Sequence, residues 1–106
     1  MINEKDLQNF VHCLDEKRFY DAHEVLEALW FAKRFENSNE VKLIKGFINA
    51  AVSFELIKRG RHAPSKKAWL NYLKYRQYLF KTKSKKVQLY YEVHLHIEAT
   101  HKIMHS

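Results

Sequence analysis

Residues 43–60 read LIKGFINAAVSFELIKRG, and this stretch decides the expected fold. On a helical wheel its apolar side chains cover most of the circumference and leave only a narrow polar stripe. A helix that is apolar on nearly every side is typical of the centre of a helical protein. Gly46 lies beside the polar stripe and would let a neighbouring helix approach closely. We therefore expect a central helix over about residues 40–59, capped by Asn39 and stopped by Gly60.

Apolar residues with helical spacing also occur on both sides of this central segment. They predict four further helices, over about residues 7–14, 21–35, 64–80 and 87–105. Two glycines and one proline leave few turn signals for a sheet of many strands. A chain of 106 residues fits one domain comfortably and two poorly. We therefore expect an all-α fold in which residues 1–106 form a single compact bundle of about five helices.

The composition favours a cytoplasmic protein without a membrane span. The most apolar segment, residues 43–54, is interrupted by Lys45 and Asn49 and is too short to cross a bilayer. The single Cys13 cannot form an internal disulfide, so nothing indicates an oxidising compartment. The first ten residues lack the basic flank and the apolar block of a signal peptide.

The segment FYDAHEVLEALW, residues 19–30, contains a backbone-capping pattern. Asp21 is followed three residues later by Glu24, which is the spacing of a capping box with Asp in place of the usual Ser or Thr. Tyr20 and Val25 then occupy the two positions of a hydrophobic staple. This pattern predicts a helix that starts at Asp21 and gives Glu24 a structural role near its amino end.

His23 and Glu27 lie four residues apart, so they share one helix face and can hydrogen-bond. Apolar side chains border this polar stripe on both flanks, and we therefore expect it to face another element or a cleft. One interpretation is a structural network completed by Lys45 or Asn49 of the central helix, because an unpaired buried polar group costs about 1–3 kcal/mol. The candidate polar site then comprises His23, Glu24, Glu27, Trp30, Lys45 and Asn49.

A second interpretation of the same stripe is a metal-dependent, hydrolase-like enzyme that uses His23, Glu24 and Glu27. A His followed by carboxylates at the next and the fourth position resembles the HExxH helix of zinc enzymes, but Glu27 replaces the second His. Di-iron bundles use paired Glu-x-x-His units, and no second such unit occurs in the third or fourth expected helix. A metal ion is the cofactor that this alternative would need.

The pattern of an aromatic residue, Ala-His-Glu-Val-Leu-Glu and then Trp, followed later by a segment ending in Arg-Gly, resembles a bacterial and archaeal family called domain of unknown function 309. The resemblance covers about residues 10–75. The matching residues are Phe19, Ala22, His23, Glu24, Val25, Leu26, Glu27, Trp30, Gly46, Ile48, Arg59 and Gly60. Where the family tends to have glutamines, this chain has Lys45 and Asn49. The resemblance implies a small all-helical bundle with no assigned activity, and it implies that the His-Glu-x-x-Glu pattern is a feature of the family.

Basic residues are concentrated in one third of the chain. Residues 56–91 contain 11 Lys and Arg and no acidic residue, although the net charge of the whole chain is only +7. Between residues 58 and 86 these cations alternate with aromatic residues, which suits phosphate neutralisation and base stacking. The candidate nucleic-acid contacts are Lys66, Lys67, Lys74 and Arg76. The alternative is that the aromatic residues form a core stripe while the lysines face solvent.

The last expected helix carries a row of potential metal ligands. His94, Glu98 and His101 lie at helical spacing on one face, and zinc accepts both imidazole and carboxylate. The sequence shows no outer shell of residues that would orient these ligands. The row lies outside the part of the chain that resembles the family.

These observations favour a non-enzymatic binding or interaction module that contains a structural His–Glu network and needs no cofactor. Its expected partner is another protein or a second copy of the chain. The metal-dependent enzyme is the first alternative, and a nucleic-acid-associated protein that uses residues 58–86 is the second.

Overall fold

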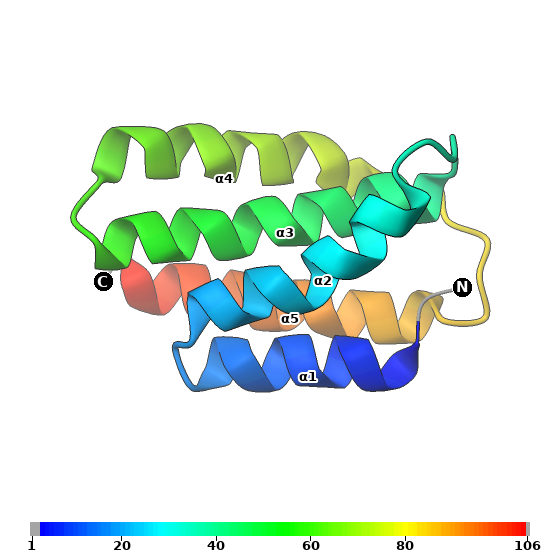
Figure 1. The fold of residues 1–106 in the computed structure, drawn as a ribbon, viewed down its shortest axis with the longest axis horizontal. Helices are drawn as coiled ribbons and strands as arrows, with labels where there is room; N and C mark the ends of the chain where they lie inside the picture. The colour runs from blue at the N-terminus through cyan, green and yellow to red at the C-terminus, as the bar shows by residue number, and fades with distance from the viewer. Residues whose placement is uncertain (1–2, 106) are drawn as a thin grey trace.

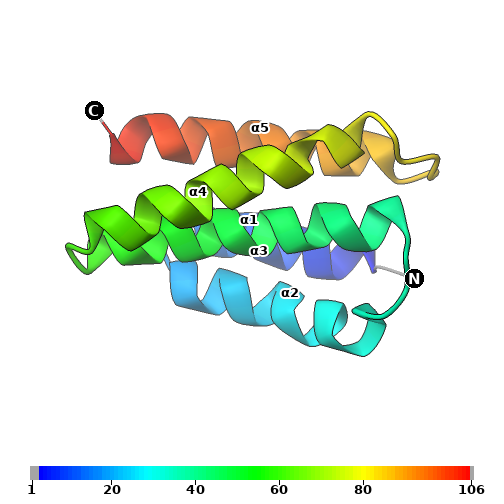
Figure 2. The ribbon, with the colours of Figure 1, turned by 90° about the horizontal axis from the view of Figure 1, so that it is seen from above.

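Five α-helices and one short 3₁₀ helix make up residues 3–105, the part of the chain that the computed structural model describes. They are α1 (Glu4–Asp15), α2 (Phe19–Lys33), α3 (Asn39–Lys58), α4 (His62–Arg76), η1 (Gln77–Leu79) and α5 (Val87–Met104). The expected all-α bundle of five helices is thereby confirmed. α3 lies in the middle, with α2 and α4 against it, while α1 packs between α2 and α5 (Figures 1 and 2).

α3 is central because its apolar side chains pack against several neighbouring helices. Phe47 is fully buried and lies against Phe10 of α1 and Tyr90 of α5, with ring centroids 6.3 and 6.4 Å away. Phe54, about two turns later, is also fully buried and contacts aromatic rings of α2 and α4. A helix in this position needs the apolar circumference that the sequence shows. Within residues 3–105, no helix has the length and apolarity required to cross a bilayer.

Small residues set the distance between α3 and α4. A Cβ atom placed on Gly46 would lie only 2.8 Å from the Cβ of Tyr75, so α4 reaches its position because residue 46 has no side chain. Nearer the α3–α4 turn, Ser53 and Ser65 are buried and hydrogen-bond reciprocally. The Ser53 hydroxyl donates to the Ser65 carbonyl at 2.9 Å, and the Ser65 hydroxyl donates to the Ser53 carbonyl at 2.8 Å. Both buried hydroxyls are satisfied in this way.

The start of α3 differs by one residue from the expectation. Ser38 is the N-cap, and its hydroxyl accepts a hydrogen bond from the Val41 amide at 3.1 Å. The predicted cap, Asn39, is instead the first residue of the helix, and its side-chain amide donates to the Lys81 carbonyl at 3.0 Å. Asn39 therefore ties the start of α3 to the loop before α5, a contact that the sequence could not show.

The end of α3 confirms the expected glycine stop. Gly60 has a φ of +75°, the left-handed conformation that a residue without Cβ adopts at low cost. The Gly60 amide donates to the Ile57 carbonyl at 2.9 Å, and the Arg61 amide donates to the Leu56 carbonyl at 2.8 Å. These two bonds form a Schellman motif, which satisfies carbonyls at the end of the helix.

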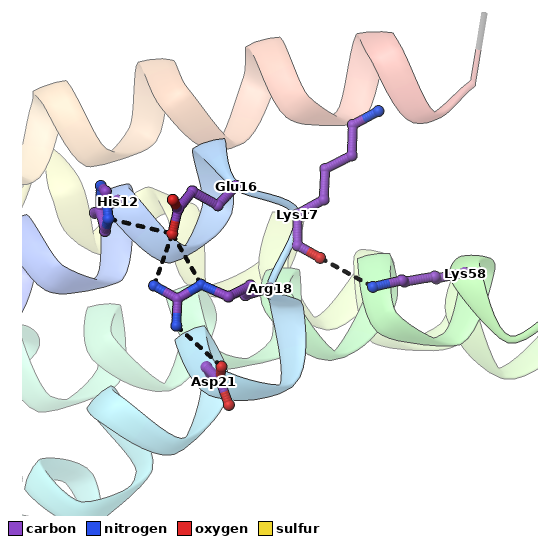
Figure 3. Close-up of polar contacts among 6 residues, drawn as sticks. All are labelled: His12, Glu16, Lys17, Arg18, Asp21 and Lys58. Atoms are coloured by element: carbon purple, nitrogen blue, oxygen red, sulfur yellow. Dashed lines mark hydrogen bonds and ion pairs between the residues drawn. The ribbon is translucent and has the colours of Figure 1, made fainter.

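The turn between α1 and α2 also forms a Schellman motif, but a lysine, Lys17, occupies the left-handed position that favours glycine. Lys17 has a φ of 59°, and its carbonyl accepts a bond from the Lys58 ammonium of α3 at 3.2 Å. Arg18 is the N-cap of α2, and its guanidinium contacts Glu16 at 2.8 Å and Asp21 at 3.2 Å (Figure 3). The predicted capping box at Asp21 is therefore wrong, because α2 starts two residues earlier and Asp21 already lies in its first turn.

Lys17→Gly is expected to raise the free energy of unfolding by about 0.5–1 kcal/mol. A residue with Cβ is destabilised by about 1–2 kcal/mol in the left-handed conformation, and glycine avoids this strain. Glycine also loses more conformational entropy on folding, which cancels part of the gain. Urea unfolding followed by circular dichroism measures the change. Lys17→Ala keeps the strain and removes only the side chain, so it is the control and should not stabilise. Stabilisation by both variants would show that the backbone conformation is not the cause.

Candidate functional site

α2, α3 and α4 enclose an open cleft of about 290 Å³. It is lined by Glu27, Trp30, Lys45, Ile48, Asn49, Asn71 and Tyr75. Four of these residues, Glu27, Trp30, Lys45 and Asn49, belong to the candidate polar site identified from the sequence. Helical packing thus brings residues of α2 and α3 that are far apart in the sequence to one surface depression.

A second, smaller cavity of about 180 Å³ lies along the same α2–α3 interface. It is lined by Tyr20, His23, Val52, Glu55, Leu56 and Arg59. His23 faces this cavity and Glu27 faces the larger cleft, one helical turn away. The two depressions therefore adjoin at the His23–Glu27 pair.

The His23 imidazole lies between two carboxylates. Its Nε2 is 3.5 Å from Oε2 of Glu27, and its Nδ1 is 3.8 Å from Oε1 of Glu24. The side chains of His23 and Glu27 retain 25% and 39% of their exposure, so solvent reaches the pair. Glu24 also hydrogen-bonds the Tyr20 hydroxyl, and this bond raises the pKa of that phenol.

His23, Glu24 and Glu27 are not arranged to bind one metal ion together. Glu24 and Glu27 approach opposite nitrogens of the His23 ring, so one ion bound to either nitrogen could not also reach both carboxylates. Across residues 3–105, no group of three or more His, Cys, Asp or Glu side chains is placed to hold a metal ion. A metal-dependent reaction at His23 therefore stays a prediction without geometric support.

Lys45 and Asn49 contribute to the cleft and not to a closed network around His23. The Lys45 ammonium lies 4.4 Å from the centroid of the Trp30 ring, a cation–π contact between α3 and α2. The Asn49 amide nitrogen donates to the Lys45 carbonyl at 2.9 Å, which leaves its side-chain oxygen for other donors. Neither side chain has a hydrogen bond or an ion pair with His23 or Glu27 within the described residues 3–105.

Two lining residues of α4 were not predicted as members of this site. Asn71 and Tyr75 are four residues apart and together form the α4 wall of the cleft. Tyr75 stood out in the sequence only as one of the aromatics between basic residues. The sequence did not indicate Asn71 as a site residue, because a single polar residue on an otherwise polar helix face is common. Only the close approach of α4 at Gly46 brings this pair to the cleft.

A family described as "Domain of unknown function (DUF309)" matches residues 7–68, more than half of the 106-residue chain. The chain belongs to the DUF309 family. The match confirms the resemblance expected from the sequence and includes all of α2 and α3, together with the His-Glu-x-x-Glu segment. No curated protein and no solved structure matches the chain. The DUF309 description itself assigns no activity.

Of the candidate nucleic-acid contacts, Lys66 and Lys67 lie within the last residues of the DUF309 match, and Lys74 and Arg76 lie beyond it. Lys66, Lys67 and Lys74 are exposed, while the Arg76 guanidinium bonds the Glu98 carboxylate of α5 at 2.8 Å. The aromatic residues between them do not form an exposed stacking surface. Trp69 and Tyr72 turn toward the core, where Tyr72 is fully buried, whereas Phe80 is 79% exposed. Nucleic-acid binding by these lysines stays a prediction.

The histidine row of α5 lies outside the DUF309 match. Within it, Nδ1 of His94 lies 3.8 Å from Oε1 of Glu98, and the row also contacts residues of α4. The Tyr72 hydroxyl lies 2.8 Å from Nδ1 of His94, and the His101 ring stacks on Trp69 at 3.7 Å between centroids. Burial raises the pKa of Tyr72 well above its ordinary value, so this phenol keeps its proton in the hydrogen bond with His94. Burial likewise lowers the pKa of both His94 and His101. The predicted metal site at this row therefore gains no geometric support among the described residues.

The stability of the bundle is expected to fall as the pH drops below about 6.5, the ordinary pKa of histidine. The unfolded chain then binds protons at positions 94 and 101 that the folded chain, with lowered pKa values, still excludes. Protonation therefore favours unfolding, and the contribution present above pH 6.5 is lost on acidification. Urea midpoints measured between pH 7.5 and 5.5 test this, over a range in which few carboxylates titrate. A variant with Asn at both positions should show a flatter profile, and an equal slope in both proteins would contradict the assignment.

Proposed function

We propose that this DUF309 protein is a non-enzymatic binding module, and that its ligand site is the cleft between α2, α3 and α4. The observation that carries the proposal is the Lys45 ammonium, held over the Trp30 ring at the edge of a cavity of about 290 Å³. Within residues 3–105, no carboxylate lies at ion-pair distance from this ammonium. A half-buried cation without a counter-ion favours an anionic group on the ligand.

The other residues that line the cleft can hydrogen-bond to a ligand or pack against it. Asn49 and Asn71 supply carboxamides that donate and accept hydrogen bonds, and Glu27 supplies a carboxylate. Trp30 and Tyr75 supply ring faces and edges for a flat or apolar part of the ligand. Concave sites that combine rings with a few polar groups are typical of small-molecule binding. The volume lies at the lower end of the range for such sites, which suits a small polar anion.

The experiment uses Trp30 as its own reporter. The chain has two tryptophans, so Trp69→Phe leaves Trp30 as the single tryptophan, which is excited selectively at wavelengths where tyrosine does not absorb. Amino acids, small carboxylic acids, sugar phosphates and nucleotides are titrated against this variant, and each hit is mapped by two-dimensional NMR. We expect saturable quenching of Trp30 by anionic members, with shifts of the side-chain amides of Asn49 and Asn71. Circular dichroism checks that the reporter variant is folded.

Lys45→Met removes the charge and keeps the length of the side chain. It is expected to weaken binding about tenfold or more, because a hydrogen bond to a charged group contributes about 1.5–3 kcal/mol. The matched control is Lys42→Met, on the same helix but with its ammonium over the Tyr78 ring, outside the cleft. If no probe binds, or if both variants bind equally well, the cleft is not the ligand site.

A further inference from the structure

Exposed apolar side chains gather where α4 and α5 adjoin, away from the cleft. We define the α4–α5 face as Leu70, Leu73, Tyr91 and Leu95. Leu70 is 54% exposed, Tyr91 43% and Leu95 49%, while Leu73 is half-buried against the core. Single exposed apolar residues are ordinary, but a group on adjacent helices marks an interaction surface.

The α4 members lie on the flank that faces away from the proposed ligand cleft. Asn71 and Tyr75 line that cleft, so the flank of α4 that they occupy is directed toward α2. Leu70 and Leu73 are three residues apart and therefore share a different flank of the helix. Tyr72, which separates them in the sequence, points into the core.

The α5 members lie beside this flank of α4. Glu92 and His96 line a groove with α1, so they occupy the flank of α5 that is turned away from α4. Tyr91 and Leu95 are four residues apart on the other flank, next to His94, which contacts α4 through Tyr72. α4 and α5 are neighbouring helices (Figure 2), joined by the contacts of Tyr72 with His94 and of Arg76 with Glu98. Leu70, Leu73, Tyr91 and Leu95 therefore lie on adjacent flanks of the two helices.

Cations border this apolar surface. Lys66, Leu70 and Lys74 follow one another at four-residue spacing, so they form one exposed row along α4 with the leucine between the lysines. Lys102 is exposed on α5, seven residues after Leu95 and therefore on the same side of that helix. The stretch 56–91, which supplies α4, contains no acidic residue. The face therefore combines apolar contacts with a positive rim.

We propose that the α4–α5 face docks an acidic amphipathic helix of another protein. Apolar residues of such a helix would pack between the two rows of apolar side chains, as ridges of one helix pack into the groove between two others. Glu or Asp residues on its flanks would pair with Lys66, Lys74 and Lys102 and would increase the rate of encounter. α4 has 15 residues and is therefore about 22 Å long, so a partner helix of about 15 residues covers the face.

A second copy of the chain fits this face less well. The acidic amphipathic helix of the chain itself is α1, and its apolar residues Leu7, Phe10 and Leu14 are already buried in the bundle. Pairing two α4–α5 faces would bring Lys66 and Lys74 of one copy against those of the other, and like charges placed together oppose association. An external helix supplies both the negative charge and the free apolar side that these contacts need.

The test selects helical peptides of about 16 residues against the full chain by phage display and measures the enriched peptides by fluorescence anisotropy and NMR. The peptide library fixes helix-forming residues and varies the remaining positions without bias in charge. The expected winners are negatively charged, carry apolar residues at helical spacing, and shift the amides of α4 and α5. Leu70→Glu or Leu95→Glu should weaken binding tenfold or more. Phe31→Glu on α2, where the parent side chain is 57% exposed, is the matched control and should not change it.

Charge is tested separately from apolar contact. Replacing Lys66 and Lys74 together by Gln is expected to lower the association rate and to reduce its dependence on salt. Replacing Lys5 and Lys33, exposed lysines of α1 and α2, is the control for net charge and should have the smaller effect.

Four outcomes would overturn the proposal. They are the absence of enriched peptides, winners without acidic and apolar patterning, winners that bind elsewhere, and winners insensitive to the two glutamate variants. A dimer in sedimentation that Leu70→Glu or Leu95→Glu dissociates would assign the face to a second copy instead. Co-sedimentation with phosphatidylglycerol–phosphatidylcholine vesicles, lost in the same variants while no peptide binds, would assign it to an anionic membrane.

Discussion

Phe54→Ala is expected to lower the free energy of unfolding by about 3–5 kcal/mol. The Phe54 ring is fully buried, with the Phe19 ring of α2 at 5.4 Å and the Trp69 ring of α4 at 5.9 Å between centroids. The His101 ring of α5 lies 6.5 Å away. Truncation therefore removes apolar contacts with three helices at once and leaves a cavity that rigid helices cannot fill.

Urea unfolding monitored by circular dichroism and by tryptophan fluorescence measures the Phe54 effect. Phe35→Ala is the matched control, because that ring is 87% exposed and its removal should change stability by no more than about 0.5 kcal/mol. A loss below about 1 kcal/mol for Phe54→Ala would mean that the surrounding helices close the space, in contradiction to a rigid central α3.

Gly46→Val is expected to cost about 2–3 kcal/mol through overpacking between α3 and α4. The added Cβ would meet the Cβ of Tyr75 at 2.8 Å, and neither atom can rotate away because both are fixed to their backbones. α4 must therefore move outward. Since Tyr75 also lines the cleft, the same movement should widen the proposed ligand site and weaken the binding of any probe that contacts Tyr75.

Ala32→Val on the exposed side of α2 isolates the effect of a β-branched residue on helix propensity, which costs at most about 0.7 kcal/mol. Gly46→Ala provides a second comparison, because alanine favours the helix by about 1 kcal/mol over glycine. A stabilising Gly46→Ala variant would show that α4 accommodates the methyl group, and the close contact would then not constrain the cleft.

The sequence predicted the type and order of the helices because each has to bury an apolar stripe. This periodicity is a property of the chain and does not depend on which neighbour covers the stripe. It also identified α3 as central, since no other segment is apolar around so much of its circumference. The glycine stop at Gly60 could be predicted for a similar reason, because a left-handed helix end strongly favours a residue without Cβ.

Helix starts were less predictable because several adjacent residues could serve as caps. Ser38 and Asn39 both have suitable side chains, and the extended backbone of Ser38 decides between them. At α2, the left-handed Lys17 ends α1 so abruptly that the next helix begins before the apparent capping box at Asp21. Pro64 suggested a start at that residue, but α4 begins at His62, because a proline is tolerated within the first turn, where amides lack helical partners.

The candidate site could likewise be predicted only in part from the sequence. The sequence by itself determined the His23–Glu27 pair, because two residues at four-residue spacing on one helix must share a face. It also indicated Trp30, Lys45 and Asn49 as members of the candidate polar site.

Only the tertiary structure decided that these groups line one open cleft and that Asn71 and Tyr75 complete it. The physical reason is that helix periodicity fixes which side chains point outward from each helix, whereas the distance between helices depends on side-chain volume at their closest contacts. Here that contact is Gly46, whose missing side chain brings α4 close enough to form the third wall.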